Sequence, residues 1–258
     1  MESVNTKISI FSLWRDSEDY IRRTLKQLED LETEYPEIEF SYFFYENDSI
    51  DNTVQILSEW LKSRKGKMLS ENISFPKEGS VMTASRMKKM AYYRNRMIEL
   101  GRFIKSDYSI VFDSDVIFDK KIIKQFLSKI DNETIMYTPY ISQNIKCKLC
   151  NCGTDSYYDI AALYDQYNHR GLIWSCNPFV NVFDRQNFAT NKPVEVNSAF
   201  GGFAFIKSFP LNFCNWRSTG DIEHVLFCEE IKKYGKIKVY PDIKVSVQLS
   251  EELIKKYG

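Results

Sequence analysis

The sequence has no excess of charge of either sign, because 35 lysines and arginines are matched by 35 aspartates and glutamates. A neutral chain lacks the electrostatic attraction that drives binding to nucleic acid or to anionic membranes. The sequence also lacks a run of about 18 apolar residues, and its first residues show no basic stretch followed by an apolar one. We therefore expect no nucleic-acid partner, no integral membrane segment and a soluble, cytoplasmic protein.

The sequence has no stretch rich in proline, glycine or serine that would separate two domains. A chain of 258 residues without such a linker can bury one substantial core. Short apolar segments alternate with longer amphipathic ones, which is typical of a βαβ sheet. The sequence therefore predicts a single α/β, Rossmann-like domain over residues 1–258, with a nucleotide-binding half in residues 1–130 and a second half in residues 131–258.

Hydrophobic periodicity places the main helices and strands. The first helix is expected to begin after a cap at Asp16 or Ser17. Residues 140–191 show little periodicity and are rich in Cys, Tyr and Asn, so they are predicted to form long loops around a site. Further helices are expected within residues 51–64, 82–100, 120–130 and 221–234, and strands within residues 7–16, 38–48, 108–113, 195–208 and 236–247.

Two carboxylates, Asp113 and Asp115, interrupt the apolar segment "YSIVFDSDVIFD". In an extended segment both point to the same side, and ligands of open α/β sheets gather at the carboxyl ends of the strands. Carboxylates at this edge can hold Mg²⁺ or Mn²⁺, which would neutralise a diphosphate. The alternative is that the pair opens a turn and caps the next helix. Other charged residues at predicted strand ends are Arg15, Asp16, Glu46 and Asp48.

Arg94 falls in the middle of the apolar face of the helix expected over residues 82–100. A desolvated guanidinium without a partner is costly, so Arg94 needs an anion beside it. A structural salt bridge to Asp113 or Glu46 and a contact with a bound phosphate both satisfy this need. Either arrangement places Arg94 next to the acidic ends of the strands.

Six cysteines occur in a chain without a recognisable secretion signal, so a disulfide framework is not the default expectation. Cys147, Cys150 and Cys152 lie together in "CKLCNC" and can supply three zinc thiolates, with His169 or Cys176 as a fourth ligand. A disulfide and reduced thiols in a loop are the alternatives. In each case we expect the cluster to take no part in the chemistry.

Three segments of the first half resemble the nucleotide-sugar half of GT-A glycosyltransferases, most closely the capsule-associated fungal α-1,3-mannosyltransferase family: "FFYENDSIDNTVQILSEW", "SRMKKMAYYRNRMIEL" and "YSIVFDSDVIF". The later segments "VNSAFGGFAFIK" and "GDIEHVLFCEEIKKYGKIKVYPDIKV" resemble the acceptor half of that family. The resemblance implies a GT-A fold with a mixed central sheet and a Cys-rich insertion in residues 140–191. It also implies metal-dependent transfer of a hexose, with retention, from a GDP- or UDP-linked sugar to a glycan or other hydroxyl acceptor.

The resemblance also implies roles for individual residues. Asp115 would bind the metal, and Asp113 would bind the ribose or share the metal. Glu46 and Asp48 would reach the base and ribose. The remaining residues expected at the nucleotide sugar are Arg15, Arg86, Arg94, Ser114, Gly201 and Gly202, the two glycines because the backbone can approach a sugar closely there or, alternatively, because they form a β-bulge.

A third set of candidates lies in "TGDIEHVLFCEE". Many GT-A enzymes have a histidine metal ligand near the C-terminus, and "KVSVQLSEELIKKYG" has none, so water, a backbone group or His224 would complete the metal sphere. Glu223 is the predicted catalytic residue facing the sugar or acceptor, with Asp221 as the substitute. The alternative is that these acidic residues only stabilise the start of a helix.

Two other classes of protein share a charged sheet edge. A nucleotidyltransferase would carry a glycine loop for phosphate after the first strand, and "SLWRDSED" contains no glycine. A sugar-nucleotide-binding module without activity would have the same fold. Retention requires no strong base, whereas inversion requires a carboxylate that deprotonates the acceptor.

Overall fold

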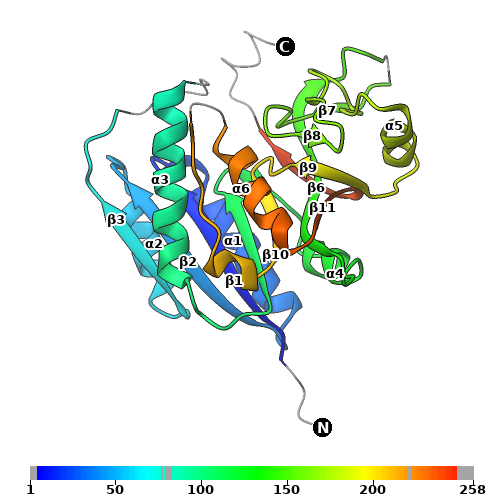
Figure 1. Cartoon of the computed structure of the whole chain (residues 1–258). Helices are drawn as coiled ribbons and strands as arrows, with labels where there is room; N and C mark the ends of the chain where they lie inside the picture. Colours follow the sequence, from blue (N-terminus) through cyan, green and yellow to red (C-terminus); the bar gives the residue numbers. More distant parts are fainter. Residues whose placement is uncertain (1–4, 77, 79–82, 151, 220–221, 249–258) are drawn as a thin grey trace.

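The structure is a computed structural model that describes residues 5–76, 78, 83–150, 152–219 and 222–248. One mixed sheet runs through the whole domain (Figure 1), in the order β3-β2-β1-β4-β10-β6-β11-β9-β8, with β5 beside β11 and β7 beside β6. The first half contributes four neighbouring parallel strands: β1 (Lys7–Trp14), β2 (Glu39–Asn47), β3 (Gly66–Glu71) and β4 (Tyr108–Asp113). The second half joins through β10 (Phe203–Lys207), which is antiparallel to β4.

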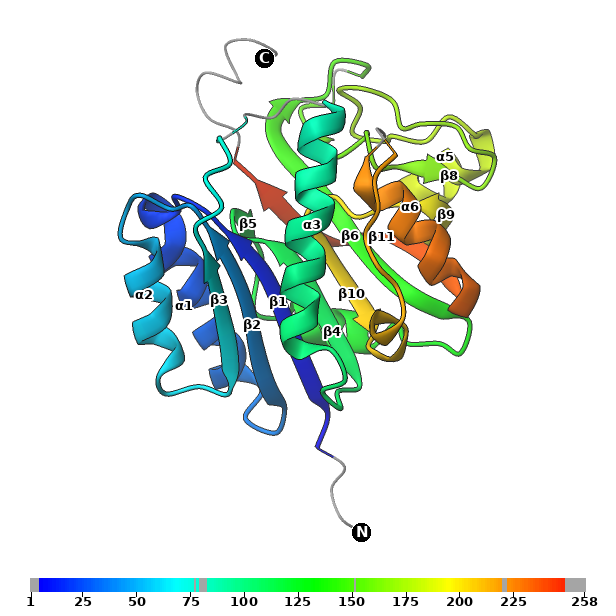
Figure 2. The ribbon, with the colours of Figure 1, turned by 60° about the vertical axis from the view of Figure 1, so that its left-hand side comes forward.

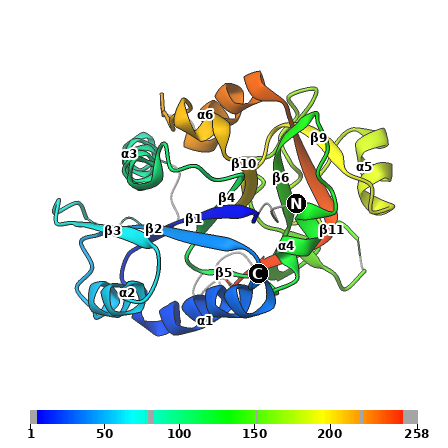
Figure 3. The ribbon, with the colours of Figure 1, turned by 90° about the horizontal axis from the view of Figure 1, so that it is seen from below.

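Helices cover both faces of this sheet. Figure 3 shows α1 (Glu18–Glu34) and α2 (Thr53–Leu61) on one face and α3 (Ala84–Gly101) and α6 (Glu223–Ile231) on the other. The strands are buried on both sides, so their alternate residues feed two cores. Ile10 belongs to the core under α1, whereas Phe11 belongs to the core under α3. In Figure 2, α3 lies across the β1 region of the sheet with its N-terminal end toward the carboxyl ends of the strands.

The second half is built on two long parallel strands, β6 (Thr134–Lys146) and β11 (Lys236–Val247). The short strand β5 (Val116–Ile117) follows β4 and pairs in antiparallel fashion with the end of β11. The strand expected within residues 236–247 and the strands expected within residues 195–208 are confirmed. The remaining elements are β9 (Val194–Ser198), α4 (Ile122–Leu127) and two short 3-10 helices, Phe209–Asn212 and Lys232–Tyr234.

The expectation of long loops over residues 140–191 was wrong in part. Strand β6 continues to Lys146, and the region also holds β7 (Asp155–Tyr157), β8 (Tyr164–Asp165) and α5 (Val182–Ala189). These elements are too short or too polar to show a period in the sequence. Strand β3 was not expected either, because it is a polar strand at the edge of the sheet. No helix in the described part of the chain is long and apolar enough to cross a membrane.

Candidate active site

The predicted charged strand ends meet at one edge of the sheet. Leu13 of β1 pairs in register with Asp113 of β4, and Trp14 pairs with Glu46 of β2. Parallel strands with this register end at the same level, so the loops that follow them share one opening. The expectation that these strand ends form a single site is consistent with the geometry.

Helix α1 holds the Asp113-Ser114-Asp115 turn in place. Ser114 is buried, and its hydroxyl lies 3.2 Å from the Tyr20 hydroxyl. Thr24 donates to the Ser114 carbonyl at 2.7 Å, and Arg23 donates to the Asp115 carbonyl at 3.1 Å. Ser114 therefore anchors the turn rather than facing a ligand with a free hydroxyl. The turn is fixed before any ligand binds.

Arg94 joins the two halves of the domain. Its guanidinium donates to both oxygens of Asp113 at 2.9 and 3.4 Å, and its Nε donates to Glu223 at 3.2 Å. The Arg94 side chain is only 3% exposed and lies over the Phe200 ring. Burial by itself lowers the pKa of Arg94, but the charges of Asp113 and Glu223 outweigh it and raise that pKa. Arg94 thus stays charged between two carboxylates from different elements.

Glu223 and His224 open helix α6 and are both buried. His224 stacks on Phe200 with ring centroids 4.0 Å apart, and its Nδ1 accepts from the Trp216 indole at 3.2 Å. Burial, with the charges of Arg94 and Arg86, lowers the pKa of His224 well below its usual value. The neutral ring therefore carries its proton on Nε2, which lies 3.4 Å from Glu223 Oε1.

Asp115 is half-buried beside another carboxylate. Burial and the charge of Asp113 raise the pKa of Asp115 to about 6. Among the described residues, its carboxylate accepts a hydrogen bond only from its own backbone N–H. The charges of Arg23 and Arg94 act on it without a direct bond to the carboxylate, since Arg23 donates to the Asp115 carbonyl and Arg94 is shared by Asp113 and Glu223.

This donor set fits a hard divalent cation. Asp113 and Asp115 offer oxygen ligands, and Mg²⁺ is usually bound by one or two carboxylates together with substrate phosphates and water. Within the residues that the structure describes, a group of three or more possible metal ligands occurs only among the cysteines. His224 has both ring nitrogens engaged by Trp216 and Glu223, so a bond from His224 to a metal would have to replace one of these contacts.

Three adjoining cavities open along the strand ends. The first, about 400 Å³, lies over Glu46 and Asp48 and shares Arg15 with the second. The second, about 300 Å³, contains Asp113 and Asp115. The third, about 260 Å³, reaches Glu223 and His224, and it shares five residues with the second: Arg86, Met90, Asp113, Tyr158 and Gly202. A larger hollow between α1 and α2 contains none of the predicted site residues.

The sequence matches the family described as Cryptococcal mannosyltransferase 1 over residues 7–232. This match covers most of the chain and includes every candidate residue of the site. The chain belongs to the cryptococcal mannosyltransferase family. The family that the sequence motifs resemble is therefore confirmed. No curated protein matches the chain.

Solved structures with the same fold are GT-A glycosyltransferases. S. aureus TarS 1-349 in complex with UDP-GlcNAc matches with a TM-score of 0.57 at 15% identity, covering 95% of this chain and 59% of TarS 1-349. Mannosyltransferase PcManGT from Pyrobaculum calidifontis, in complex with GDP-Man and Mn²⁺, matches with a TM-score of 0.53 at 10% identity, covering 95% of this chain and 57% of PcManGT. This member of the mannosyltransferase family thus has the predicted GT-A fold, and it spans less than two thirds of the length of either neighbour.

The residues expected at the base and ribose are largely engaged within the protein. Glu46 accepts from the Ser49 N–H at 2.8 Å and from the Ser70 hydroxyl at 2.5 Å. Asp48 accepts backbone N–H groups of residues 73–75. Burial opposes ionisation of Asp48, yet these hydrogen bonds lower its pKa. Both acids shape the first cavity: Asp48 holds the loop at residues 73–75, and Glu46 ties Ser49 to Ser70.

The cationic candidate Arg15 and the glycine Gly202 line the cavities along the strand ends. Arg15 donates to the Phe75 carbonyl at 2.9 Å, while its buried Nε has no hydrogen-bond partner in the described part of the chain. Gly201 and Gly202 have φ of +60° and +90°, and the Gly202 carbonyl accepts from the Asp113 N–H at 2.8 Å. Any side chain at Gly202 would begin beside Asp113 and Val116, which explains the need for glycine there. Asp221 lies outside the described residues.

Two site residues were missed by the sequence reasoning, Tyr158 and Asp159, which directly follow β7. Asp159 is half-buried and accepts from the Ala162 N–H at 3.2 Å. Burial raises the pKa of Asp159 to about 6, and the charges of Glu223 and Asp113 add to the effect. The signal in the sequence was "DSYYDI", an aromatic and acidic segment inside the stretch that was treated as loops.

We expect Arg94→Met to lower the free energy of unfolding by about 3–5 kcal/mol, because it leaves the buried Glu223 carboxylate without its cation and removes the partner of the partly exposed Asp113. The measurement is urea unfolding at pH 7. The matched control is Arg96→Met on the same helix, whose partners Glu71 and Glu99 are partly exposed. This control should cost about 1 kcal/mol or less. Equal losses in the two variants would show that Arg94 does not join the halves as described.

The raised pKa of Asp159 predicts a pH dependence. A carboxyl group whose pKa is higher in the folded state than in the unfolded state stabilises the fold at low pH, and this contribution is lost as the pH rises from about 4 to about 6. Relative to the parent, Asp159→Asn should therefore gain stability across that window, by at most roughly 3 kcal/mol, and remain level above it. Unfolding free energies of both proteins from pH 4 to 8, with exposed Asp119→Asn as control, test this. A flat difference for Asp159→Asn would contradict it.

Proposed function

We propose that this protein is a metal-dependent glycosyltransferase that moves a hexose, mannose in the first instance, from a nucleoside diphosphate sugar to a hydroxyl group of a glycan. The observation that carries the proposal is the row of three cavities with Asp115, a half-buried carboxylate that forms no ion pair in the described part of the chain, in the middle one. Family membership supports transfer of mannose. The GDP-Man and Mn²⁺ of the neighbour PcManGT support the donor class and the metal class.

In this proposal the nucleoside occupies the first cavity, the diphosphate the second, and the sugar and acceptor the third. Mn²⁺ or Mg²⁺ held by Asp115 and Asp113 would supply charge compensation for the departing diphosphate. The unpaired Nε of Arg15, between the first and second cavities, is placed to donate to a phosphate oxygen. Arg86 lines both the second and the third cavity and is assigned to the donor sugar or diphosphate.

Glu223 is assigned to the transferred sugar or the acceptor. One of its oxygens accepts from Arg94 Nε at 3.2 Å and lies 3.4 Å from His224 Nε2, so this carboxylate is held in one orientation. A carboxylate fixed in this way is placed to orient a hydroxyl group and to balance positive charge on the sugar ring. We propose transfer with retention at the anomeric carbon, as the resemblance of the sequence motifs implies; retention needs no strong base.

We expect Asp115→Asn to reduce metal-dependent turnover about a hundredfold or more, because a neutral amide holds the cation weakly and leaves the charge of the leaving group unbalanced. The assay is hydrolysis or transfer with GDP- and UDP-sugars and Mn²⁺ or Mg²⁺. Asp119→Asn, in the next turn of the same segment, is the control and should keep full activity, since Asp119 only accepts the Lys121 N–H. A folded Asp115→Asn protein with normal turnover would refute the metal assignment.

Glu223→Gln should cut transfer at least about a hundredfold, the lower range for losing a positioned acid, base or electrostatic group. Nucleotide affinity should change little, because Glu223 lines only the third cavity. Glutamine can still accept from Arg94, so the fold should survive. Glu229→Gln, an exposed position on the same helix, is the matched control. Normal transfer, or a loss of nucleotide binding instead, would remove Glu223 from the acceptor side.

A further inference from the structure

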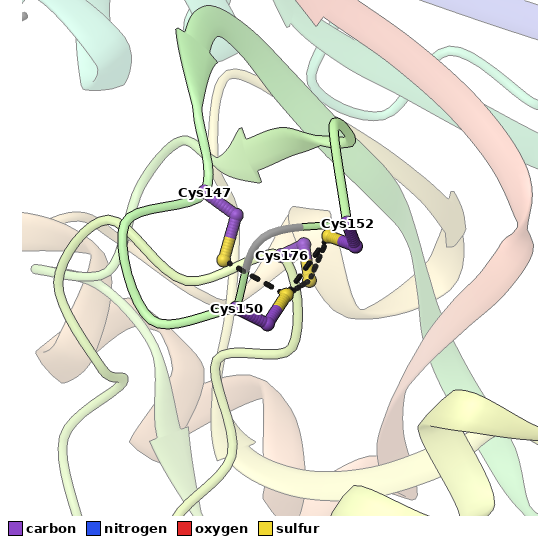
Figure 4. A group of neighbouring side chains, drawn as sticks. All are labelled: Cys147, Cys150, Cys152 and Cys176. Atoms are coloured by element: carbon purple, nitrogen blue, oxygen red, sulfur yellow. Dashed lines mark hydrogen bonds between the residues drawn. The ribbon is translucent and has the colours of Figure 1, made fainter.

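Four cysteines from two separate loops converge outside the candidate active site (Figure 4). Cys147, Cys150 and Cys152 lie in the connection between β6 and β7, and Cys176 lies in the segment between β8 and α5. Their sulfur atoms all lie within 4.8 Å of one another. His169, the other ligand considered from the sequence, instead has its Nδ1 2.9 Å from Asp165 Oδ2. None of these four cysteines lines a cavity of the candidate site.

The sulfur distances match a tetrahedral metal site better than a pair of disulfides. The Sγ atom of Cys150 lies 3.4, 2.8 and 3.4 Å from the Sγ atoms of Cys147, Cys152 and Cys176, respectively. The Sγ atoms of Cys152 and Cys176 are 3.6 Å apart. Zinc with about 2.3 Å bonds to four thiolates places the sulfurs about 3.8 Å apart. A disulfide requires about 2.05 Å, and all four thiols are free.

We propose that Cys147, Cys150, Cys152 and Cys176 bind one structural zinc ion. Neutral thiols are weak hydrogen-bond donors and acceptors, so hydrogen bonding gives four of them little reason to converge at a partly exposed site. Four thiolates complete the tetrahedral sphere of zinc and leave no open position for water or substrate. The site is therefore structural and distinct from the carboxylate edge, where a hard cation is expected.

Backbone N–H groups also point at sulfur atoms of the cluster. Those of Cys176 and Cys150 donate to the Cys147 thiol, and that of Thr154 donates to the Cys152 thiol. Backbone donors to the sulfurs are the outer contacts that orient thiolate ligands in metal sites.

The proposed zinc would join two loops that share little hydrophobic core. Leu149 and Ile173 are 60% and 58% exposed, and the loops are linked by the Lys148 N–H to Trp174 carbonyl bond and the Tyr157 N–H to Ser175 carbonyl bond. Strand β7 leads directly from this cluster to Tyr158 and Asp159, which line the third cavity. The metal thus stabilises the segment that forms one wall of the acceptor end.

The first test is elemental analysis of the purified full chain, together with a count of reactive thiols after denaturation with a chelator. We expect about one zinc per chain and all six thiols reactive. Absence of zinc with only two reactive thiols, those of Cys214 and Cys228, would establish two disulfides and overturn the proposal. Six thiols without zinc, or iron in place of zinc, would also overturn it.

Variants locate the metal. Cys150→Ser combined with Cys176→Ser should abolish zinc binding and increase proteolysis between β6 and α5. Asp115→Asn, at the carboxylate edge, and Cys214→Ala, a buried thiol outside the cluster, should both retain one zinc. Reconstitution of the metal-free parent with Co²⁺ should give the thiolate charge-transfer bands of tetrahedral cobalt. Loss of zinc in Asp115→Asn, or its retention in the double cysteine variant, would place the metal elsewhere.

Discussion

The buried guanidinium of Arg94 is the contact on which the candidate site depends. It joins Asp113, at the end of a strand in the first half, to Glu223, at the start of a helix in the second half. A charged group with 3% of its side chain exposed is tolerated only because both carboxylates are placed to meet it. The two halves therefore fit in one relative position, and that position aligns the cavities. The same contact fixes the orientation of the Glu223 carboxylate before substrate binds.

Four carboxylates gather around one buried guanidinium in this arrangement. Asp113 and Glu223 share Arg94, while Asp115 and Asp159 form no ion pair in the described part of the chain. Burial, together with the neighbouring carboxylates, raises the pKa of both Asp115 and Asp159 to about 6. Under the proposed function, a divalent cation would compensate the charge of Asp115, and positive charge developing on a sugar in the third cavity would compensate that of Asp159. Stability of the empty protein is thus reduced in the places where charge is to be accommodated during transfer.

The sequence predicted the elements and residues whose signals are local. The apolar run before Asp113, and the position of Arg94 on the apolar face of α3, were sufficient to place both at one edge and to name Asp113 as a possible partner. Arg94 and Glu223 are 129 residues apart in the sequence, so hydrophobic periodicity could not predict their pairing. Glu46 was therefore named as the other possible partner of Arg94. Glu46 and Asp48 were expected at a ligand, whereas their oxygens accept hydrogen bonds within the protein: those of Glu46 from Ser49 and Ser70, and those of Asp48 from the backbone of residues 73–75. Tyr158 and Asp159 were missed because their position depends on a three-residue strand paired to β6.

The segment whose sequence shows the least periodicity also has few buried apolar side chains to stabilise it. Residues 147–181 contain only the short strands β7 and β8 and expose several apolar side chains, yet they end in contacts that shape the acceptor end of the site. Four cysteines drawn together from both ends of this segment supply the missing constraint if their thiolates share a metal. The domain then uses two metals of opposite chemistry: a hard cation on oxygen ligands at the diphosphate, exchanged with substrate, and a soft site on sulfur that is closed. Because the two donor sets select different ions, each metal can be removed without displacing the other.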